Sequence, residues 1–86
     1  MFEQGDLEVV RLRRFDNQES KLKAFVDVAI GEFIIKGLRI VQGRKGLYLA
    51  MPQEQGKDGR WYNSFYPKSA QARQILTELV LNAYQQ

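Results

Sequence analysis

The sequence contains no cysteine and no histidine among its 86 residues. Without cysteine there is no disulfide framework and no thiolate site, and without histidine the commonest general base and metal ligand is missing. The acidic residues are scattered and show no metal-loop spacing, and no serine has a histidine to activate it. We therefore expect no catalytic residue, no metal ligand, no cofactor and no small-molecule substrate, and hence a protein that is not an enzyme.

Long apolar runs are missing as well. No run approaches the ~20 residues that a transmembrane helix needs, and the acidic start MFEQGDLE lacks the basic-then-apolar layout of a signal peptide. Hydrophobic residues make up 44% of the chain and charged residues 27%, both near the average for globular proteins. The sequence thus predicts a single domain over residues 1–86, located in the cytoplasm and without a membrane partner.

Positive charge is concentrated in the first half of the chain. There are 13 Lys and Arg against 10 Asp and Glu, and nine of these bases lie between residues 11 and 45 beside four acids, or about +5. The nine bases are Arg11, Arg13, Arg14, Lys21, Lys23, Lys36, Arg39, Arg44 and Lys45. This clustering fits a polyanionic partner, and it also fits an ordinary solvated sheet face, because exposed Lys and Arg are common.

Alternation of apolar and polar residues predicts a first strand in LEVVRLRRF, from Leu7 to Phe15. We expect Val10 and Leu12 to face inward, which leaves Arg11 and Arg13 together on the other face and Arg14 at the strand end. Residues i and i+2 of a strand lie roughly 6–7 Å apart, close to the spacing of phosphates along one nucleic-acid strand. Guanidinium forks suit phosphate oxygens, so this strand is suited to hold a phosphate backbone.

Two further strands are expected at Lys21–Ile30 and Phe33–Val41, joined by a tight turn at Gly31 and Glu32. One face of the first of them should carry Leu22, Ala24, Val26, Val28 and Ile30, and the other Lys21, Lys23, Phe25 and Asp27. Asp27 is expected to be a cross-strand partner or exposed rather than catalytic. In the next strand we expect Lys36 and Arg39 on opposite faces, and Gly37 is a candidate β-bulge.

The segment GRKG, from Gly43 to Gly46, predicts a basic turn before a fourth strand, LYLAM. Its tip residues either keep the turn soluble or make a secondary phosphate contact. A polar loop, EQGKDG, then precedes an aromatic segment from Arg60 to Pro67. We expect Trp61 to pack in the core, because a small domain needs its large side chains buried. If exposed, the aromatic side chains that would stack on unpaired bases are Tyr48, Trp61, Tyr62 and Tyr66.

The last segment, SAQARQILTELVLNAYQQ, predicts a helix that Ser69 caps and that packs on the sheet. Its apolar stripe comprises Ala72, Ile75, Leu76, Leu79, Val80 and Ala83. Leu81 lies nearly opposite this stripe and is either a tolerated exposed leucine or a contact with a second subunit. Arg73 is the only base on this helix, which disfavours a recognition helix for the DNA major groove.

Several motifs together resemble one family, the bacterial stage V sporulation protein G (SpoVG) or septation-regulator family. The motifs are VRLRR from Val10, FIIKGLRIVQG from Phe33, GLYLAMP from Gly46, DGRW from Asp58, and then Pro67, Arg73 and Tyr84. They extend over nearly the whole chain. The chain departs from the family pattern at Asn63, Phe65 and Tyr66, which enlarge the aromatic segment, and at Lys36 and Gly37, which make the surface more basic.

This resemblance implies an α+β fold, a small antiparallel β-sheet of hairpins with one C-terminal helix packed on it. It also implies a homodimer that binds DNA and possibly RNA in bacterial gene regulation related to sporulation or septation. From charge and strand alternation, we predict the nucleic-acid-binding residues to be Arg11, Arg13, Arg14, Lys21, Lys23, Arg39, Arg44 and Lys45. The alternative is a non-enzymatic protein-interaction module that uses exposed strand edges.

Overall fold

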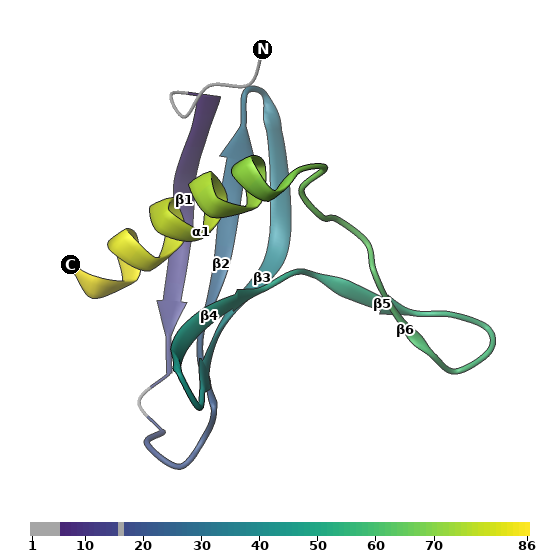
Figure 1. The fold of residues 1–86 in the computed structure, drawn as a ribbon, viewed down its shortest axis with the longest axis horizontal. Helices are drawn as coiled ribbons and strands as arrows, with labels where there is room; N and C mark the ends of the chain where they lie inside the picture. Colours follow the sequence, from purple (N-terminus) through teal and green to yellow (C-terminus); the bar gives the residue numbers. More distant parts are fainter. Residues whose placement is uncertain (1–5, 16) are drawn as a thin grey trace.

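The structure is a computed structural model that describes residues 6–15 and 17–86, and within them it has two β-sheets and one helix (Figure 1). The larger sheet is antiparallel with strand order β1-β2-β3-β4, and β5 pairs with β6 as a separate hairpin. The elements are β1 (Leu7–Arg14), β2 (Leu22–Ile30), β3 (Phe33–Gly43), β4 (Gly46–Ala50), β5 (Gln53–Gln55), β6 (Trp61–Asn63) and α1 (Ala70–Gln85). The predicted α+β arrangement, hairpins with a C-terminal helix on the sheet, is confirmed.

The hydrophobic core lies between one face of the larger sheet and α1. The predicted inward face of β2 is confirmed from Ala24 onward, where Ala24, Val26 and Val28 are fully or almost fully buried. Leu22 differs, because a register shift at the start of β2 pairs it with Val41 and leaves it half-buried, outside the core. The buried hydrophobic residues are Leu7, Ala24, Val26, Val28, Ala29, Leu38, Ile40, Leu49, Met51, Leu76 and Val80.

Strand β1 departs from the predicted alternation at Val10. Val9 pairs with Val28 and Leu12 pairs with Val26, so β1 has one residue more than β2 between these two pairs. The extra residue forms a bulge that reverses the alternation. Val9 therefore packs against the core, and the side chain of Val10 is 47% exposed. The expectation that Val10 faces inward is wrong, whereas Leu12 does pack against the core.

Strand β3 carries a second bulge at the same level of the sheet. Lys36 and Gly37 together lie opposite the single residue Asp27 of β2. Gly37 has φ of +89°, a conformation that side chains with a Cβ rarely adopt. The predicted bulge at Gly37 is confirmed. Because the other bulge lies opposite the same part of β2, Asp27 has an irregular strand on each side.

The two predicted tight turns are present. The β2–β3 turn consists of Gly31 and Glu32, with φ of +58° at Gly31. Arg44 and Lys45 form the two-residue turn between β3 and β4. Both connections are short enough to fix the register of the strands that they join.

The polar loop and the start of the aromatic segment form the β5–β6 hairpin, a pairing that the sequence reading did not predict. Gln55 pairs with Trp61, and the amide of Gly56 donates to the carbonyl of Arg60 at 2.8 Å. The side chains of both strands are exposed. Figure 1 shows this hairpin projecting away from the larger sheet. Its short strands carry little apolar alternation, which explains why the pairing was not apparent.

The helix begins as predicted. Ser69 is its N-cap, and the Ser69 hydroxyl accepts a hydrogen bond from the amide of Ala72 at 3.1 Å. Leu76 and Val80 are buried, but Leu81 also packs against the core and is only partly exposed. The reading of Leu81 as a tolerated exposed leucine is therefore wrong, because α1 contacts both β1 and β4 and buries a wider arc than the predicted stripe. Its contact with a second subunit stays a prediction. No helix in residues 6–15 and 17–86 is long and apolar enough to cross a membrane.

Candidate nucleic-acid interface

The face of the sheet opposite α1 is not covered by the helix and carries a row of basic and aromatic side chains. Arg13 of β1 pairs with Phe25 of β2, and Phe25 pairs in turn with Arg39 of β3. Because residues directly opposite in neighbouring strands project from the same face, these three side chains lie side by side. Phe25 is 38% exposed between the two guanidinium groups. We call this side of the sheet the open face.

A second row on the open face results from the two bulges. Arg11 pairs with Asp27, and Lys36 and Gly37 lie opposite the same aspartate. Arg11 and Arg13 therefore share one face, as the alternation predicted. The expectation that Lys36 and Arg39 lie on opposite faces is wrong, because the extra residue at Gly37 turns Lys36 to the side of Arg39.

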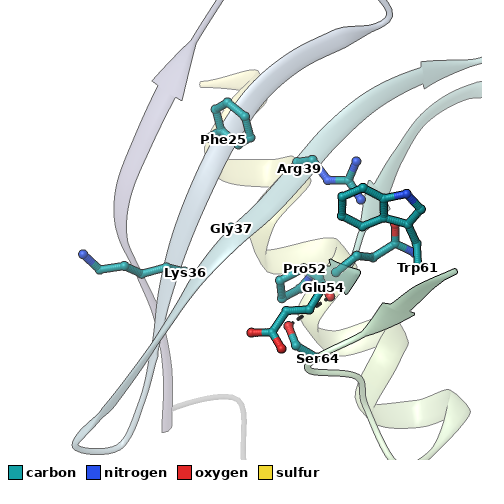
Figure 2. Close-up of a pocket in the computed structure, with 9 residues that line it drawn as sticks. Phe25, Lys36, Gly37, Arg39, Pro52, Glu54, Trp61 and Ser64 are labelled. Atoms are coloured by element: carbon teal, nitrogen blue, oxygen red, sulfur yellow. Dashed lines mark hydrogen bonds between the residues drawn. The ribbon is translucent and has the colours of Figure 1, made fainter. Parts of the chain in front are cut away.

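Two adjoining pockets occupy this face. The smaller has a volume of about 220 Å³ and is lined by Arg11, Arg13, Phe25, Asp27, Lys36 and Gly37. The larger, of about 570 Å³, lies where the β5–β6 hairpin leaves the sheet, and its lining includes Phe25, Lys36, Gly37, Arg39, Glu54 and Trp61. The two pockets share three residues and thus form one continuous depression. Figure 2 shows Trp61 and Arg39 at one end of the larger pocket and Lys36 at the other.

Arg39 is fixed in the larger pocket by the backbone. Its guanidinium Nη2 donates to the carbonyl of Met51 at 3.1 Å. The Ser64 hydroxyl donates to the carbonyl of Pro52 at 3.3 Å, and the amide of Ser64 donates to the same carbonyl at 2.9 Å. These bonds connect the end of the hairpin to the segment after β4. They hold the wall of the pocket against the edge of the sheet.

The exposed aromatic residues are a correction to the sequence reading, which expected Trp61 in the core. Trp61 is 62% exposed, because the hairpin that carries it projects beyond the sheet and brings no second layer to cover it. Three tyrosines are exposed as well: Tyr48, Tyr62 and Tyr66 have 50%, 51% and 66% of their surface exposed. Of these four side chains, Trp61 is the one that lines the larger pocket.

Four of the predicted binding residues lie elsewhere, at one end of the sheet. Lys21 directly precedes β2, Lys23 is the second residue of that strand, and Arg44 and Lys45 form the β3–β4 turn. The carbonyl of Lys21 accepts the amide of Gln42 at 2.8 Å, so the two segments are neighbours. We call these four residues the end cluster. Its four residues line neither pocket of the open face, and Tyr48, which is 50% exposed, lies beside the β3–β4 turn.

Arg14 is positioned by the helix rather than by the open face. Its Nη2 donates to the carbonyl of Tyr84 at 2.6 Å and reaches the carbonyls of Gln86 at 3.3 Å and Ala83 at 3.4 Å. Its Cζ lies 5.3 Å from the centre of the Tyr84 ring. Arg14 therefore caps the C-terminus of α1, where a cation interacts favourably with the helix dipole. Its position separates it from Arg11 and Arg13.

The loop of the β5–β6 hairpin is closed by a carboxylate. Asp58 accepts hydrogen bonds from the Tyr62 hydroxyl at 2.5 Å and from the amide of Arg60 at 3.0 Å. The Tyr62 hydroxyl, followed by the Arg60 amide, lowers the pKa of Asp58 below its ordinary value. The same hydrogen bond to Asp58 raises the pKa of Tyr62. This network orders the hairpin that carries Trp61.

Residues 6–15 and 17–86 contain no group of three or more His, Cys, Asp or Glu side chains placed to hold a metal ion. Lys36 and Glu54 were not among the predicted binding residues, although both line the larger pocket. Gly37 could have indicated the position of Lys36, because a bulge at that glycine changes the face of the sheet from which the neighbouring side chain projects. Glu54 had no comparable signal in the polar loop.

Comparison with known proteins identifies similar sequences along nearly the whole chain. The sequence model of the SpoVG family matches residues 6–86. A protein of Archaeoglobus fulgidus named "Putative septation protein SpoVG" is 37% identical over 81 residues, which are 92% of this chain and 95% of that protein. Proteins with the same name are 40% identical over 78 residues in Heliobacterium modesticaldum, covering 90% and 86%, and 30% identical over 80 residues in Bdellovibrio bacteriovorus, covering 92% and 74%. The family resemblance carried by the sequence motifs is confirmed.

Proposed function

The chain belongs to the SpoVG family, and we propose that it is a cytoplasmic, non-enzymatic regulator that binds DNA or RNA through the open face of its sheet. In this proposal the protein acts as a homodimer in gene regulation related to sporulation or septation. The observation that carries it is the set of four basic side chains, Arg11, Arg13, Lys36 and Arg39, gathered around Phe25 on the uncovered face.

Phosphate binding is the chemistry that this set supports best. Arg11 and Arg13 lie at i and i+2 of β1 and present two guanidinium forks, each of which matches the oxygens of a phosphate. They belong to a strand of the sheet, so their backbones are held more rigidly than those of loop lysines. Asp27 and Glu54 are the acids that line the two pockets, so four cations outnumber two carboxylates there. The net positive charge favours a polyanion.

The feature that supports self-association is apolar surface at the end of the sheet that carries the β2–β3 turn. An apolar pocket of about 530 Å³ lies between the end of the sheet and the start of α1, and Leu7, Ile30 and Phe65 contribute to its lining. Beside it, at the β2–β3 turn, the side chains of Phe33 and Ile34 are 74% and 51% exposed. Exposed apolar surface of this kind marks interaction sites, and burying it between two copies would stabilise a domain with a thin core. Light scattering should give a dimer at micromolar concentration, and a monomer would contradict this part of the proposal.

The binding test compares two double variants that lose equal charge. Arg11→Gln with Arg13→Gln removes both forks of β1, and Lys57→Gln with Arg73→Gln removes two exposed cations outside the open face. Fluorescence anisotropy with short labelled DNA and RNA at several salt concentrations gives the affinity and its salt dependence. Two arginines per subunit make four contacts per dimer, so the slope of log K against log salt should fall by roughly 3–4 for duplex DNA in the first variant.

Two results would contradict the proposal. One is a folded Arg11→Gln, Arg13→Gln protein with unchanged affinity and slope. The other is an equal loss in the control pair, which would show that only net charge matters. A separate experiment tests for enzymatic activity. When the same labelled strands are incubated with the protein, with and without divalent metal, we expect no cleavage of the nucleic acid. Cleavage that co-purifies with the protein through several columns would contradict its non-enzymatic assignment.

A further inference from the structure

The larger pocket of the open face combines features that phosphate binding alone does not use. Its volume of about 570 Å³ falls within the ~300–1,000 Å³ of sites that hold small ligands. Trp61 projects from β6 at one side of it, 62% exposed, and Phe25 lies on the sheet at another, 38% exposed. Two aromatic side chains with so much exposed surface beside one pocket form a platform for a flat, apolar ring.

The pocket is lined by two cations, Lys36 and Arg39, and by one carboxylate, Glu54, which is the group suited to contact a base. Glu54 lines the pocket, and Figure 2 shows its side chain next to Pro52 and Ser64. A carboxylate repels a phosphate, whereas it accepts hydrogen bonds from the amino group of a base such as cytosine. Arg39 lines the pocket as well, with its guanidinium held by the Met51 carbonyl, and a fixed planar cation can stack on a base.

The phosphate groups of a nucleic acid would bind next to this pocket. The smaller pocket shares Phe25, Lys36 and Gly37 with the larger one and adds the guanidinium groups of Arg11 and Arg13. A strand that crosses β1, β2 and β3 would thus place its backbone on the basic side chains while one base enters beside Trp61. Duplex DNA cannot do this without unpairing, because its bases are stacked inside the helix.

We propose that the pocket between the β5–β6 hairpin and the sheet holds one unpaired base of a single-stranded nucleic acid, stacked on Trp61. The inference rests on the proposed function of the open face and names its ligand class, single strands rather than duplex. Glu54 selects a base with an exocyclic amino group, since cytosine presents a donor where thymine and uracil present a carbonyl acceptor. The hairpin network of Asp58 and Tyr62 keeps Trp61 in position.

Trp61 is the single tryptophan of the chain, so its fluorescence reports directly on the pocket. The full-length protein is titrated with eight-nucleotide oligo(dC), with oligo(dT) and with a mixed-sequence duplex, and intrinsic fluorescence is measured beside the anisotropy of labelled strands. Oligo(dC) is expected to quench Trp61 and to bind more tightly than oligo(dT) and the duplex. Trp61→Ala is expected to weaken oligo(dC) binding about tenfold or more, the usual effect of removing a stacked aromatic ring.

Tyr66→Ala is the matched control, because the side chain of Tyr66 is as exposed as that of Trp61 but does not line the pocket. It is expected to change oligo(dC) affinity far less than Trp61→Ala does, and Glu54→Gln is expected to bring the affinities for oligo(dC) and oligo(dT) closer together. Equal binding of duplex and single strand with no effect of Trp61→Ala would overturn the base pocket and leave the proposed function intact. Failure of all three nucleic acids to bind would overturn both.

Discussion

Replacing Gly37 by alanine is expected to lower both the stability of the sheet and its affinity for nucleic acid. Gly37 has φ of +89°, and a residue with a Cβ costs about 1–2 kcal/mol in the left-handed region. The added Cβ would lie 3.4 Å from the Pro52 Cβ, an ordinary contact, so the cost is conformational rather than steric. For a domain of this size each 1 kcal/mol lowers Tm by roughly 4–8 °C, which predicts a fall of roughly 4–16 °C.

The loss of affinity has a separate cause. If the chain relieves the strain by reshaping the bulge, Lys36 turns away from Arg39, because a shift of one residue moves a side chain to the other face. One phosphate contact per subunit is then lost. The slope of log K against log salt should fall by about 0.7 per contact, or roughly 1.4 for a dimer on single strands. Circular dichroism melting and anisotropy binding, at a temperature where the variant is folded, measure the two effects.

Gly31→Ala is the control for stability. Gly31 also has a positive φ, +58°, and no atom lies within 4 Å of the position of an added Cβ. Its turn joins β2 to β3 away from the open face, so the variant should melt at a similarly lowered temperature and bind like the unmodified protein. Equal losses of affinity in the two variants would show that binding follows stability alone. Normal affinity and salt slope in Gly37→Ala would refute the role given to Lys36.

Three other changes test separate parts of the structure. Arg14→Gln should destabilise the fold by about 1–2 kcal/mol, because it removes the cation at the helix C-terminus and its contact with an aromatic ring, while the salt slope of binding stays constant. Tyr62→Phe should raise the pKa of Asp58 toward 3.8, seen by NMR titration. Since the folded pKa is depressed, the hairpin gains stability from this bond above pH 3.8 and loses it as pH falls through the folded value. Asp27→Asn should strengthen binding to single and double strands at low salt, because it removes a negative charge from the open face, and unchanged anisotropy curves would contradict this.

Much of the fold follows from patterns that are local in the sequence. Alternation identified the four strands of the larger sheet, glycine placed their turns, and Ser69 marked the start of the helix. The wrong predictions of strand faces arose where one extra residue in a strand changes the alternation of inward and outward side chains. The bulge at Val10 left that residue exposed instead of inward, and the bulge at Gly37 moved Lys36 to the side of Arg39. A bulge is set by the pairing of two strands, so a single strand's sequence does not determine which residue is the extra one.

The candidate site depended on tertiary contacts that sequence patterns do not contain. Arg14 and Arg13 are neighbours in a basic run, yet the first caps the helix and the second lies on the open face. Trp61 was expected in the core on the basis of its size, but the hairpin that carries it has no layer above it. Glu54 enters the pocket through the pairing of β5 with β6, which the polar loop did not predict.

The most direct measurement of the central claim is a map of the binding surface by two-dimensional amide NMR, with single-stranded oligonucleotide added to the labelled protein. The largest chemical-shift changes are expected on the open face, at the amides of Arg13, Phe25 and Arg39, and at the Trp61 indole. The chemical shifts of the amides of Leu76 and Val80, two helix residues buried against the opposite face, should not change. Shifts confined to α1 or to the end cluster, with the open face unchanged, would contradict the claim that this protein binds nucleic acid through the open face of its sheet.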